Sequence, residues 1–399
     1  MIAEGLVVEP ARPVEGFVTR GQPVAAAAVR AMLGSHAPHA LLLVGPPSVG
    51  KTTLALDLAA GRLCTHPEPA RRPCRTCRGC RLVAIGHHPD LHRLAPGGAG
   101  RQILIGEPPP ADPSPGTIRH LVGELALLPV EGGARVAVVE QAQRMNEDAQ
   151  NALLKTLEEP PPGVTIVLCA DDEDRLLPTV RSRCARVRLG PVPRREIEAL
   201  LAERGVADPP TAARLARLAA GRPGLAFAYA LAPETVVVRE ELARSLLDLL
   251  SARRSGRLTA IRQLLARGTE LMAALDRALG GEPAVVQVVG SDVPDTVDPP
   301  EAPGRRTTAA ERRRSALTLL DVWRDLARDL AVVTRGARAG LRDPGLLDDL
   351  EAVARAVDPA AAAAFLARLE RTAGLIEANA NPELALDVLV LAWPDAAVA

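Results

Sequence analysis

Two short stretches of this chain hold residues whose types and spacing could do chemistry. Residues 41–53 read LLLVGPPSVGKTT, which matches the pattern G-x-x-x-x-G-K-[ST] at every fixed position. Residues 64–80 read CTHPEPARRPCRTCRGC and hold four cysteines. The first pattern is typical of a loop that binds nucleotide phosphates, and the second is typical of a metal site.

The stretch at residues 45–52, called the phosphate loop below, predicts backbone N–H groups that face phosphate oxygens, next to the positive end of a helix. Lys51 would bridge the β- and γ-phosphates, and the Thr52 hydroxyl would reach Mg²⁺. A turn with an incidental lysine is the alternative. The predicted nucleotide-binding residues are Gly45, Pro46, Pro47, Ser48, Val49, Gly50, Lys51, Thr52, Thr53 and Glu140.

ATP hydrolysis also requires particular residues at the end of a later strand, which here is the apolar run RVAVV at residues 135–139. In many ATPases such a strand ends in two acidic residues, one for the metal's water shell and one that orients the attacking water. Here it ends in Glu140 and Gln141, and the carboxamide of Gln141 has no lone pair as basic as that of a carboxylate. We therefore expect slow hydrolysis.

The next apolar run, VTIVLC at residues 164–169, is followed by Ala170 and then by four acidic residues, 171–174. A neutral polar residue would usually contact the γ-phosphate at this place. Acidic side chains would repel a triphosphate unless they turn away from it. A solvated acidic loop is the alternative interpretation.

The cysteine segment has the spacing C-x9-C-x2-C-x2-C. Four thiolates without an open position predict a structural Zn²⁺ rather than a catalytic one, and reduced free thiols are the alternative. The arginines around them would contact either nucleic-acid phosphates or protein, and no aromatic residues are interleaved for base stacking. The predicted zinc ligands are Cys64, Cys74, Cys77 and Cys80, and the neighbouring arginines are Arg71, Arg72, Arg75, Arg78 and Arg81.

Composition limits the class of protein. The chain of 399 residues has room for two or three domains, and with 2% aromatic residues its cores must be built from Leu, Val and Ala. The 48 basic and 48 acidic residues cancel, which removes a strong overall attraction to nucleic acid. We see neither an apolar run of about 20 residues nor a secretory signal, so we expect no membrane partner and a reducing, cytoplasmic location.

The elements that must position these residues alternate between apolar runs and helical periodicity, which predicts an α/β fold with buried parallel strands. A helix is expected after the cap Asn146, and the prolines from Pro160 to Pro162 end it. Beyond about residue 190 the pattern becomes mainly helical. Residues 95–116 and 281–307 are rich in Gly and Pro and predict a surface insertion and a flexible connection.

Several motifs in this order resemble the delta-prime family of the bacterial DNA polymerase III clamp loader. They are GQ at 21–22, HALLLVGPPSVGKTT at 39–53, the four cysteines, HPD at 88–90, NALLKTLEEPP at 151–161 and RSRC at 181–184. The resemblance covers about residues 20–233. Beyond that range only the helical composition is similar.

The resemblance implies a P-loop AAA+ α/β module at residues 1–189, a small helical lid at 190–233 and an all-α collar at 234–399, with a flexible insertion at about 281–307. It implies a hetero-oligomeric ring with gamma/tau and delta subunits, which loads the sliding clamp on primed DNA within the polymerase holoenzyme. Arg183 falls on the family's arginine finger, which reaches a neighbour's ATP site. Pairing of Arg183 with a local acid is the alternative.

Two departures from the hydrolysing relatives stand out. The gamma and tau subunits carry Asp-Glu where this chain has Glu140 and Gln141, and they carry an arginine near Gly224, whereas Arg222 lies two residues earlier. Both departures favour a non-hydrolysing member that retains Zn²⁺ and the capacity for ATP/Mg²⁺. An active ATPase motor of the gamma/tau kind and a zinc-dependent DNA-binding module are the other hypotheses.

Overall fold

The computed structural model describes residues 15–34, 38–97, 102–107, 114–131, 133–280 and 308–394. The chain divides into two compact units. The α/β unit comprises Met1–Glu203 and Gly221–Gly224, and the helical unit comprises Arg204–Ala220 and Leu225–Ala399. The predicted connection at 281–307 lies outside the described residues, as do residues 98–101 and 108–113 of the predicted insertion.

A five-stranded parallel sheet forms the centre of the α/β unit, in the order β2-β3-β4-β1-β5. The three inner strands are buried at every position, as their continuous apolar runs predict for strands covered on both faces. The strands are β1 (Ala40–Val44), β2 (Leu91–Leu94), β3 (Arg135–Val139), β4 (Val164–Ala170) and β5 (Ala185–Arg188).

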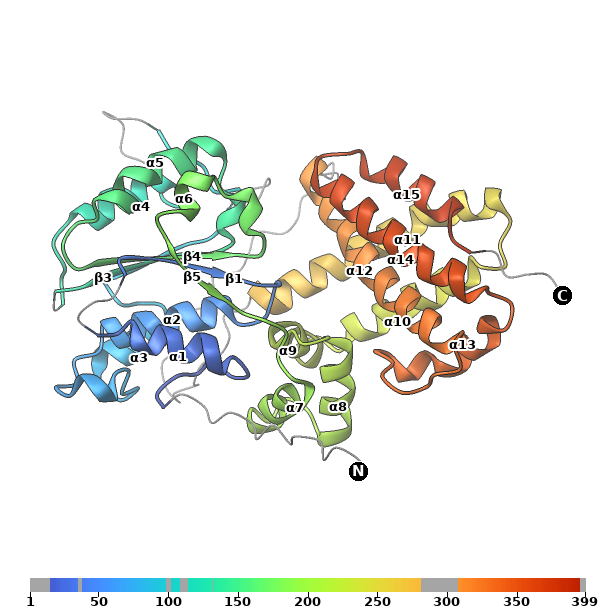
Figure 1. Cartoon of the computed structure of the whole chain (residues 1–399), viewed down its shortest axis with the longest axis horizontal. Helices are drawn as coiled ribbons and strands as arrows, with labels where there is room; N and C mark the ends of the chain where they lie inside the picture. The colour runs from blue at the N-terminus through green and yellow to red at the C-terminus, as the bar shows by residue number, and fades with distance from the viewer. Residues whose placement is uncertain are drawn as a thin grey trace, which may run out of the picture. The chain divides into compact units, whose positions relative to one another are not determined.

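Helices cover both faces of this sheet (Figure 1). One apolar core joins alternate strand residues to α1 (Pro23–Ala31), α2 (Lys51–Arg62) and α3 (Arg78–Ala84). The opposite core joins the other strand residues to α4 (Ile118–Ala126), α5 (Glu147–Glu158) and α6 (Pro178–Arg181). The predicted parallel sheet with flanking helices is therefore confirmed.

Local sequence signals set the ends of these helices. The side chain of Asn146 accepts a hydrogen bond from the Ala149 N–H and caps α5, as its position predicts. The same helix ends at Glu158, just before the proline run. Helix α7 (Arg194–Glu203) completes the unit, and the short 3-10 helices are η1 (Pro69–Arg71), η2 (Ala142–Arg144) and η3 (Glu173–Arg175).

The helical unit is built almost entirely from antiparallel and crossing helices. Helix α9 (Pro223–Leu231) begins at the boundary between the two units. The predicted lid at 190–233 spans α7, α8 and α9, and the division into module, lid and collar stays a prediction. The other helices are α8 (Pro209–Leu218), α10 (Glu234–Asp248), α11 (Arg254–Gly280), α12 (Ala309–Val333), η4 (Pro344–Leu346), α13 (Leu347–Ala354), α14 (Pro359–Glu377) and α15 (Pro382–Leu391).

The core of the helical unit contains three of the six aromatic residues of the chain. Trp323, Phe365 and Trp393 are each buried, and their ring centroids lie 4.5 to 5.4 Å apart. The indole N–H of Trp393 donates to the Leu246 carbonyl at 2.9 Å. Both tryptophans of the chain lie in this core, so tryptophan fluorescence reports on the folding of this unit.

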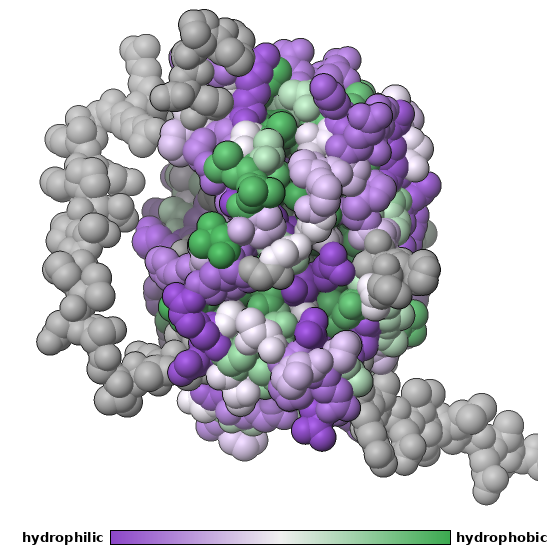
Figure 2. Space-filling model, turned by 90° about the vertical axis from the view of Figure 1, so that its left-hand side faces the viewer, coloured by the Kyte–Doolittle hydropathy of each residue, from purple (hydrophilic) through white to green (hydrophobic). Residues whose placement is uncertain are grey.

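The surface seen in Figure 2 mixes hydrophilic and hydrophobic residues, with separate small hydrophobic patches. Among the described residues, no helix combines the length and the apolar character that a bilayer span requires.

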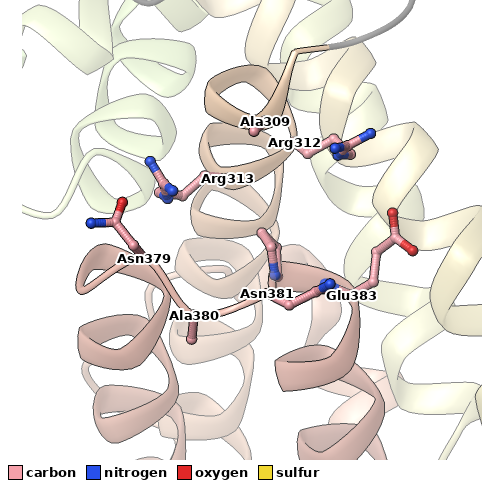
Figure 3. Close-up of a pocket in the computed structure, with 8 residues that line it drawn as sticks. Ala309, Arg312, Arg313, Asn379, Ala380, Asn381 and Glu383 are labelled. Atoms are coloured by element: carbon pink, nitrogen blue, oxygen red, sulfur yellow. The ribbon is translucent and has the colours of Figure 1, made fainter.

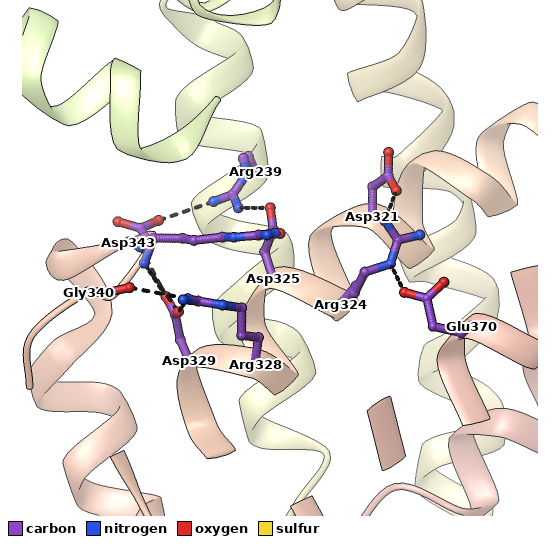
Figure 4. A network of polar contacts seen from close by, with 10 residues as sticks. Arg239, Asp321, Arg324, Asp325, Arg328, Asp329, Gly340, Asp343 and Glu370 are labelled. Carbon is purple, nitrogen blue, oxygen red and sulfur yellow. Dashed lines mark hydrogen bonds and ion pairs between the residues drawn. The ribbon is translucent and has the colours of Figure 1, made fainter. Parts of the chain in front are cut away.

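A buried ionic network stabilises the helical unit (Figure 4). The guanidinium of Arg239, in α10, donates to Asp325 at 3.0 Å and to Asp343 at 3.2 Å, and all three residues are at most 5% exposed. Asp329 accepts backbone N–H groups from Arg342 and Asp343, while burial raises the pKa of its carboxyl group. The network joins α10, α12 and the chain before α13.

We expect Arg239→Met to lower the free energy of unfolding of the helical unit by about 3 kcal/mol, because it removes the cation paired with the buried carboxylate of Asp343 and leaves Asp325 with Arg342 alone. Arg244→Met is the matched control on the same helix. Its pair with Asp349 is about half exposed, so the loss should stay below about 1 kcal/mol. Urea titration followed by tryptophan fluorescence measures both, and equal losses would contradict this account of the network.

Candidate functional site

The phosphate loop connects β1 to α2 at the carboxyl edge of the sheet. The Gly45 N–H donates to the Ala170 carbonyl at 3.2 Å, and a Cβ atom at Gly45 would clash with the Leu189 carbonyl. Ser48 and Gly50 adopt left-handed conformations, with φ of 61° and 104°. These contacts fix a tight loop at the N-terminus of α2, which is the geometry that phosphate binding requires.

Lys51 lies inside this loop and is only 7% exposed. Its Nζ donates to the carbonyls of Gly45 and Pro46 at 2.8 and 2.6 Å, and it forms an ion pair with Asp171 Oδ1 at 2.7 Å. Sequence reasoning predicted the lysine but not its carboxylate partner.

Cys169, just before the end of β4, is buried, and burial raises the pKa of its thiol to about 12.

The end of β3 places Glu140 and Gln141 near the same edge. Arg93, in β2, donates to Glu140 Oε1 through Nε and Nη2 at 3.1 and 2.8 Å. Gln141 is left-handed, with φ of 48°. A carboxylate oxygen of Glu140 is therefore engaged by an arginine, and the next side chain is an amide.

The segment 221–224 also reaches the phosphate loop. The Gly224 N–H donates to the Ser48 carbonyl at 3.0 Å. A Cβ atom at Gly224 would lie 3.1 Å from Ser48 Cβ and 3.3 Å from the Ser48 oxygen. The backbone at Gly224 thus lies directly against the phosphate loop. A side chain at this position would require the loop to shift.

Arg183 follows α6 and forms an ion pair with Glu158 at the end of α5. It also donates to the Thr179 carbonyl at 2.8 Å. Its side chain is 33% exposed, and that of Glu158 is 48% exposed. The local acid that sequence reasoning kept as an alternative is present, and the role as an arginine finger stays a prediction.

The four cysteines come together as predicted. Their sulfur atoms all lie within 4.8 Å of one another, and the sulfurs of Cys64 and Cys77 are 3.8 Å apart. A tetrahedral Zn²⁺ with Zn–S bonds of about 2.3 Å places sulfurs about 3.8 Å apart, so the donor set fits structural zinc. The geometry of the four sulfurs therefore supports the zinc assignment.

Backbone N–H groups surround the sulfurs. Those of Cys77 and Cys80 donate to the preceding ligand, Cys74 and Cys77 respectively, at 3.4 Å. The hydroxyl of Thr76 is the main reason that the pKa of Cys74 falls to about 5, whereas burial raises the pKa of Cys80. N–H donors of this kind orient and stabilise thiolate ligands.

An ion pair ties the cysteine segment to the helix that follows the phosphate loop. Arg75, left-handed with φ of 62°, pairs with Asp57 of α2 and donates to the Gly16 carbonyl at 2.7 Å. Asp57 is buried and also accepts from the N–H groups of Val18 and Thr19. Sequence reasoning did not identify this carboxylate.

Three more of these arginines also contact protein groups of the same chain. Arg78 pairs with Glu131, and Arg71 pairs with Glu68 at 2.9 Å. Arg72 donates to the His66 carbonyl at 2.7 Å. These contacts support the interpretation of the arginines as a protein-facing rim.

The HPD motif has a structural role. Asp90 is fully buried and accepts the N–H groups of Val130 and Glu131 at 2.7 Å each. His88 accepts the Asp90 N–H through Nδ1, and burial lowers the pKa of His88, which keeps its ring neutral at pH 7.

The helical unit contains a separate polar cavity of about 430 Å³ (Figure 3). Arg312 and Arg313 of α12 line it, together with the chain that enters α15. It contains none of the predicted site residues. Its other lining residues are Ala309, Asn379, Ala380, Asn381, Pro382 and Glu383.

The sheet, the phosphate loop and the flanking helices define a P-loop α/β module. The profile of the family described as "DNA polymerase III, delta subunit" matches residues 22–193. Among curated relatives, the DNA polymerase III subunit delta' of Escherichia coli is 34% identical over 268 residues, which cover 65% of this chain and 75% of that protein. The chain belongs to the delta-prime subunit family of DNA polymerase III.

The chain matches two other curated DNA polymerase III subunits over less than half of their length. The delta' subunit of Pseudomonas aeruginosa is 39% identical over 161 residues, and the match spans 40% of this chain and about half (46%) of that protein. The tau subunit of DNA polymerase III from Escherichia coli is 32% identical, covering 46% of this chain and 27% of that one. A solved gamma subunit-related protein from Thermotoga maritima is 18% identical, with a TM-score of 0.35, and covers 92% of this chain and 97% of its own.

We expect Cys74→Ser to release one bound zinc per chain and to lower thermal stability, because three thiolates no longer complete the tetrahedral set. Metal analysis of the purified variant measures the loss. Cys184→Ser is the control, since Cys184 is buried but lies outside the cluster. Full zinc retention in Cys74→Ser would refute the assignment.

Proposed function

We propose that this chain is a largely non-hydrolysing subunit of the DNA polymerase III clamp loader. It assembles a ring with gamma/tau and delta subunits and takes part in loading the sliding clamp on primed DNA, in the cytoplasm. The relatives' names and the family assignment support this role. The division into a module (1–189), a lid (190–233) and a collar (234–399) belongs to the same proposal.

The observation that carries the non-hydrolysing part is the end of β3. Glu140 is engaged by Arg93, and the amide of Gln141 follows where water activation needs a carboxylate. The backbone of Gly224 against Ser48 adds to this, because the hydrolysing relatives carry an arginine near this place. The phosphate loop and Thr52 retain the groups for holding ATP/Mg²⁺ without consuming it quickly.

The second part of the proposal is that Arg183 acts on a neighbouring subunit. Its pair with Glu158 is partly exposed, and such pairs contribute only about 0–1 kcal/mol. The guanidinium can therefore leave Glu158 for a phosphate at little cost. A guanidinium supplied across an interface stabilises charge on the transferring phosphoryl group.

An active ATPase motor of the gamma/tau kind is the second candidate, and the complete phosphate loop favours it. The zinc-dependent DNA-binding module has less support, because the arginines of the cysteine segment are engaged by protein groups.

We expect Arg183→Ala to lower ATP turnover by the assembled loader at least tenfold, while assembly measured by size-exclusion chromatography stays intact. Arg186→Ala is the matched control, since this nearby arginine is also partly exposed and paired, with Glu173. Its turnover should equal that of the wild type. Unchanged turnover in Arg183→Ala would count against the arginine-finger role.

The lone chain should release phosphate from ATP no faster than its Lys51→Ala variant, because no carboxylate follows Glu140 to activate water. A coupled phosphate-release assay with Mg²⁺ and no partner subunit measures this rate. Turnover that depends on Lys51 would favour the motor hypothesis instead.

A further inference from the structure

The ammonium group of Lys51 already has three acceptors within the chain. A lysine ammonium has three N–H donors, and here they meet two backbone carbonyls and Asp171 Oδ1, all within 2.8 Å. The lysine is 7% exposed, so water supplies little alternative hydrogen bonding. A phosphate that binds Lys51 must therefore displace one of these partners, and Asp171 is the only one of the three that carries charge.

Gln143 holds the carboxylate of Asp171 in this position. Its Nε2 donates to Asp171 Oδ2 at 2.8 Å, and its Oε1 accepts the Asp171 N–H at 3.1 Å. Gln143 lies in η2, directly after the left-handed Gln141 at the end of β3. Both oxygens of Asp171 are thus engaged, one by Lys51 and the other by Gln143.

The neighbouring acidic residues are directed elsewhere. Asp172 accepts the Asp174 N–H at 2.9 Å, and Asp174 pairs with Arg181 at 2.6 Å. Glu173 pairs with Arg186 and Arg188 of β5. Of the acidic run 171–174, only Asp171 contacts the phosphate loop in the described structure.

We infer that Asp171 is an internal anion that competes with nucleotide phosphate for Lys51, with Gln143 as its positioning residue, and that the pocket prefers nucleoside diphosphate to triphosphate. The inference rests on the proposed capacity of the phosphate loop to bind nucleotide. It adds a determinant of which nucleotide binds.

The preference follows from charge. The lysine of a phosphate loop reaches the β- and γ-phosphates, so a carboxylate bonded to the same ammonium stands close to the place of the γ-phosphate. Two anionic groups at one ammonium repel each other strongly in a partly buried site. A diphosphate brings less charge to this point and lets the pair between Lys51 and Asp171 persist to a greater extent.

The test compares the dissociation constants of ATP and ADP for the full chain, with Mg²⁺, by isothermal titration calorimetry. Asp171→Asn preserves the shape and removes the charge, so it should tighten ATP binding at least tenfold and ADP binding at most threefold. Asp172→Asn makes the same charge change one residue away. Its amide oxygen can still accept the Asp174 N–H, and both affinities should stay within twofold of the wild type.

Gln143→Ala separates positioning from simple loss of structure. It frees the carboxylate without removing it, so the ratio of ATP to ADP affinity should move in the same direction as in Asp171→Asn, by a smaller factor. Adding Lys51→Ala to Asp171→Asn should abolish the gain, because the gain passes through the ammonium group. This pair of variants keeps the inference testable if one of them folds poorly.

Unchanged or weaker ATP binding in Asp171→Asn would overturn the inference, as would an equal gain in Asp172→Asn or a gain that survives Lys51→Ala. Absence of ATP binding in both wild type and Asp171→Asn would also overturn it. These outcomes are distinct from a failure of the proposed function, which is judged by loader turnover with Arg183→Ala and does not depend on nucleotide affinity of the lone chain.

Discussion

The Lys51 ammonium lies at the carboxyl edge of the parallel sheet, and a buried charge is tolerated there only when it is fully hydrogen-bonded. Three strand ends meet at this edge, so the phosphate loop after β1, η2 after β3 and Asp171 after β4 come within reach of one another. The pair between Lys51 and Asp171 satisfies the charge without a ligand. It makes the loop stable in itself and places phosphate binding in competition with the chain's own carboxylate.

The same requirement organises other parts of the chain. The carboxylate of Asp57, in α2, accepts the N–H group of Thr19 and pairs with Arg75 of the cysteine segment. It therefore joins both segments to α2. In the helical unit Arg239 joins α10 to α12 through Asp325. Each buried charge links segments that are far apart in the sequence. These pairs therefore determine which segments pack together and also affect the stability of that packing.

Local patterns predicted much of this structure. The inner strands were predicted from apolar runs, and the phosphate loop and cysteine cluster from spacing. Strands β2 and β5 were not predicted, because each lies at an edge of the sheet and its four residues combine buried positions with partly or fully exposed ones, so neither forms a continuous apolar run. Neither the partner of Lys51 nor that of Glu140 could be predicted, since Asp171 and Arg93 reach them only through the order of the strands.

Exposure separates the two cations that matter for the proposed function. Lys51 is almost fully buried with a carboxylate held by a second side chain, so its charge is committed to its own chain. Arg183 pairs with Glu158 at a partly exposed surface, where water and salt weaken the attraction. An arginine that acts on a neighbouring subunit must dissociate from its own partner at a small cost in free energy, and the partly exposed carboxylate of Glu158 allows this. The burial of each pair therefore accords with a subunit that holds its own loop inactive while it offers an arginine to another.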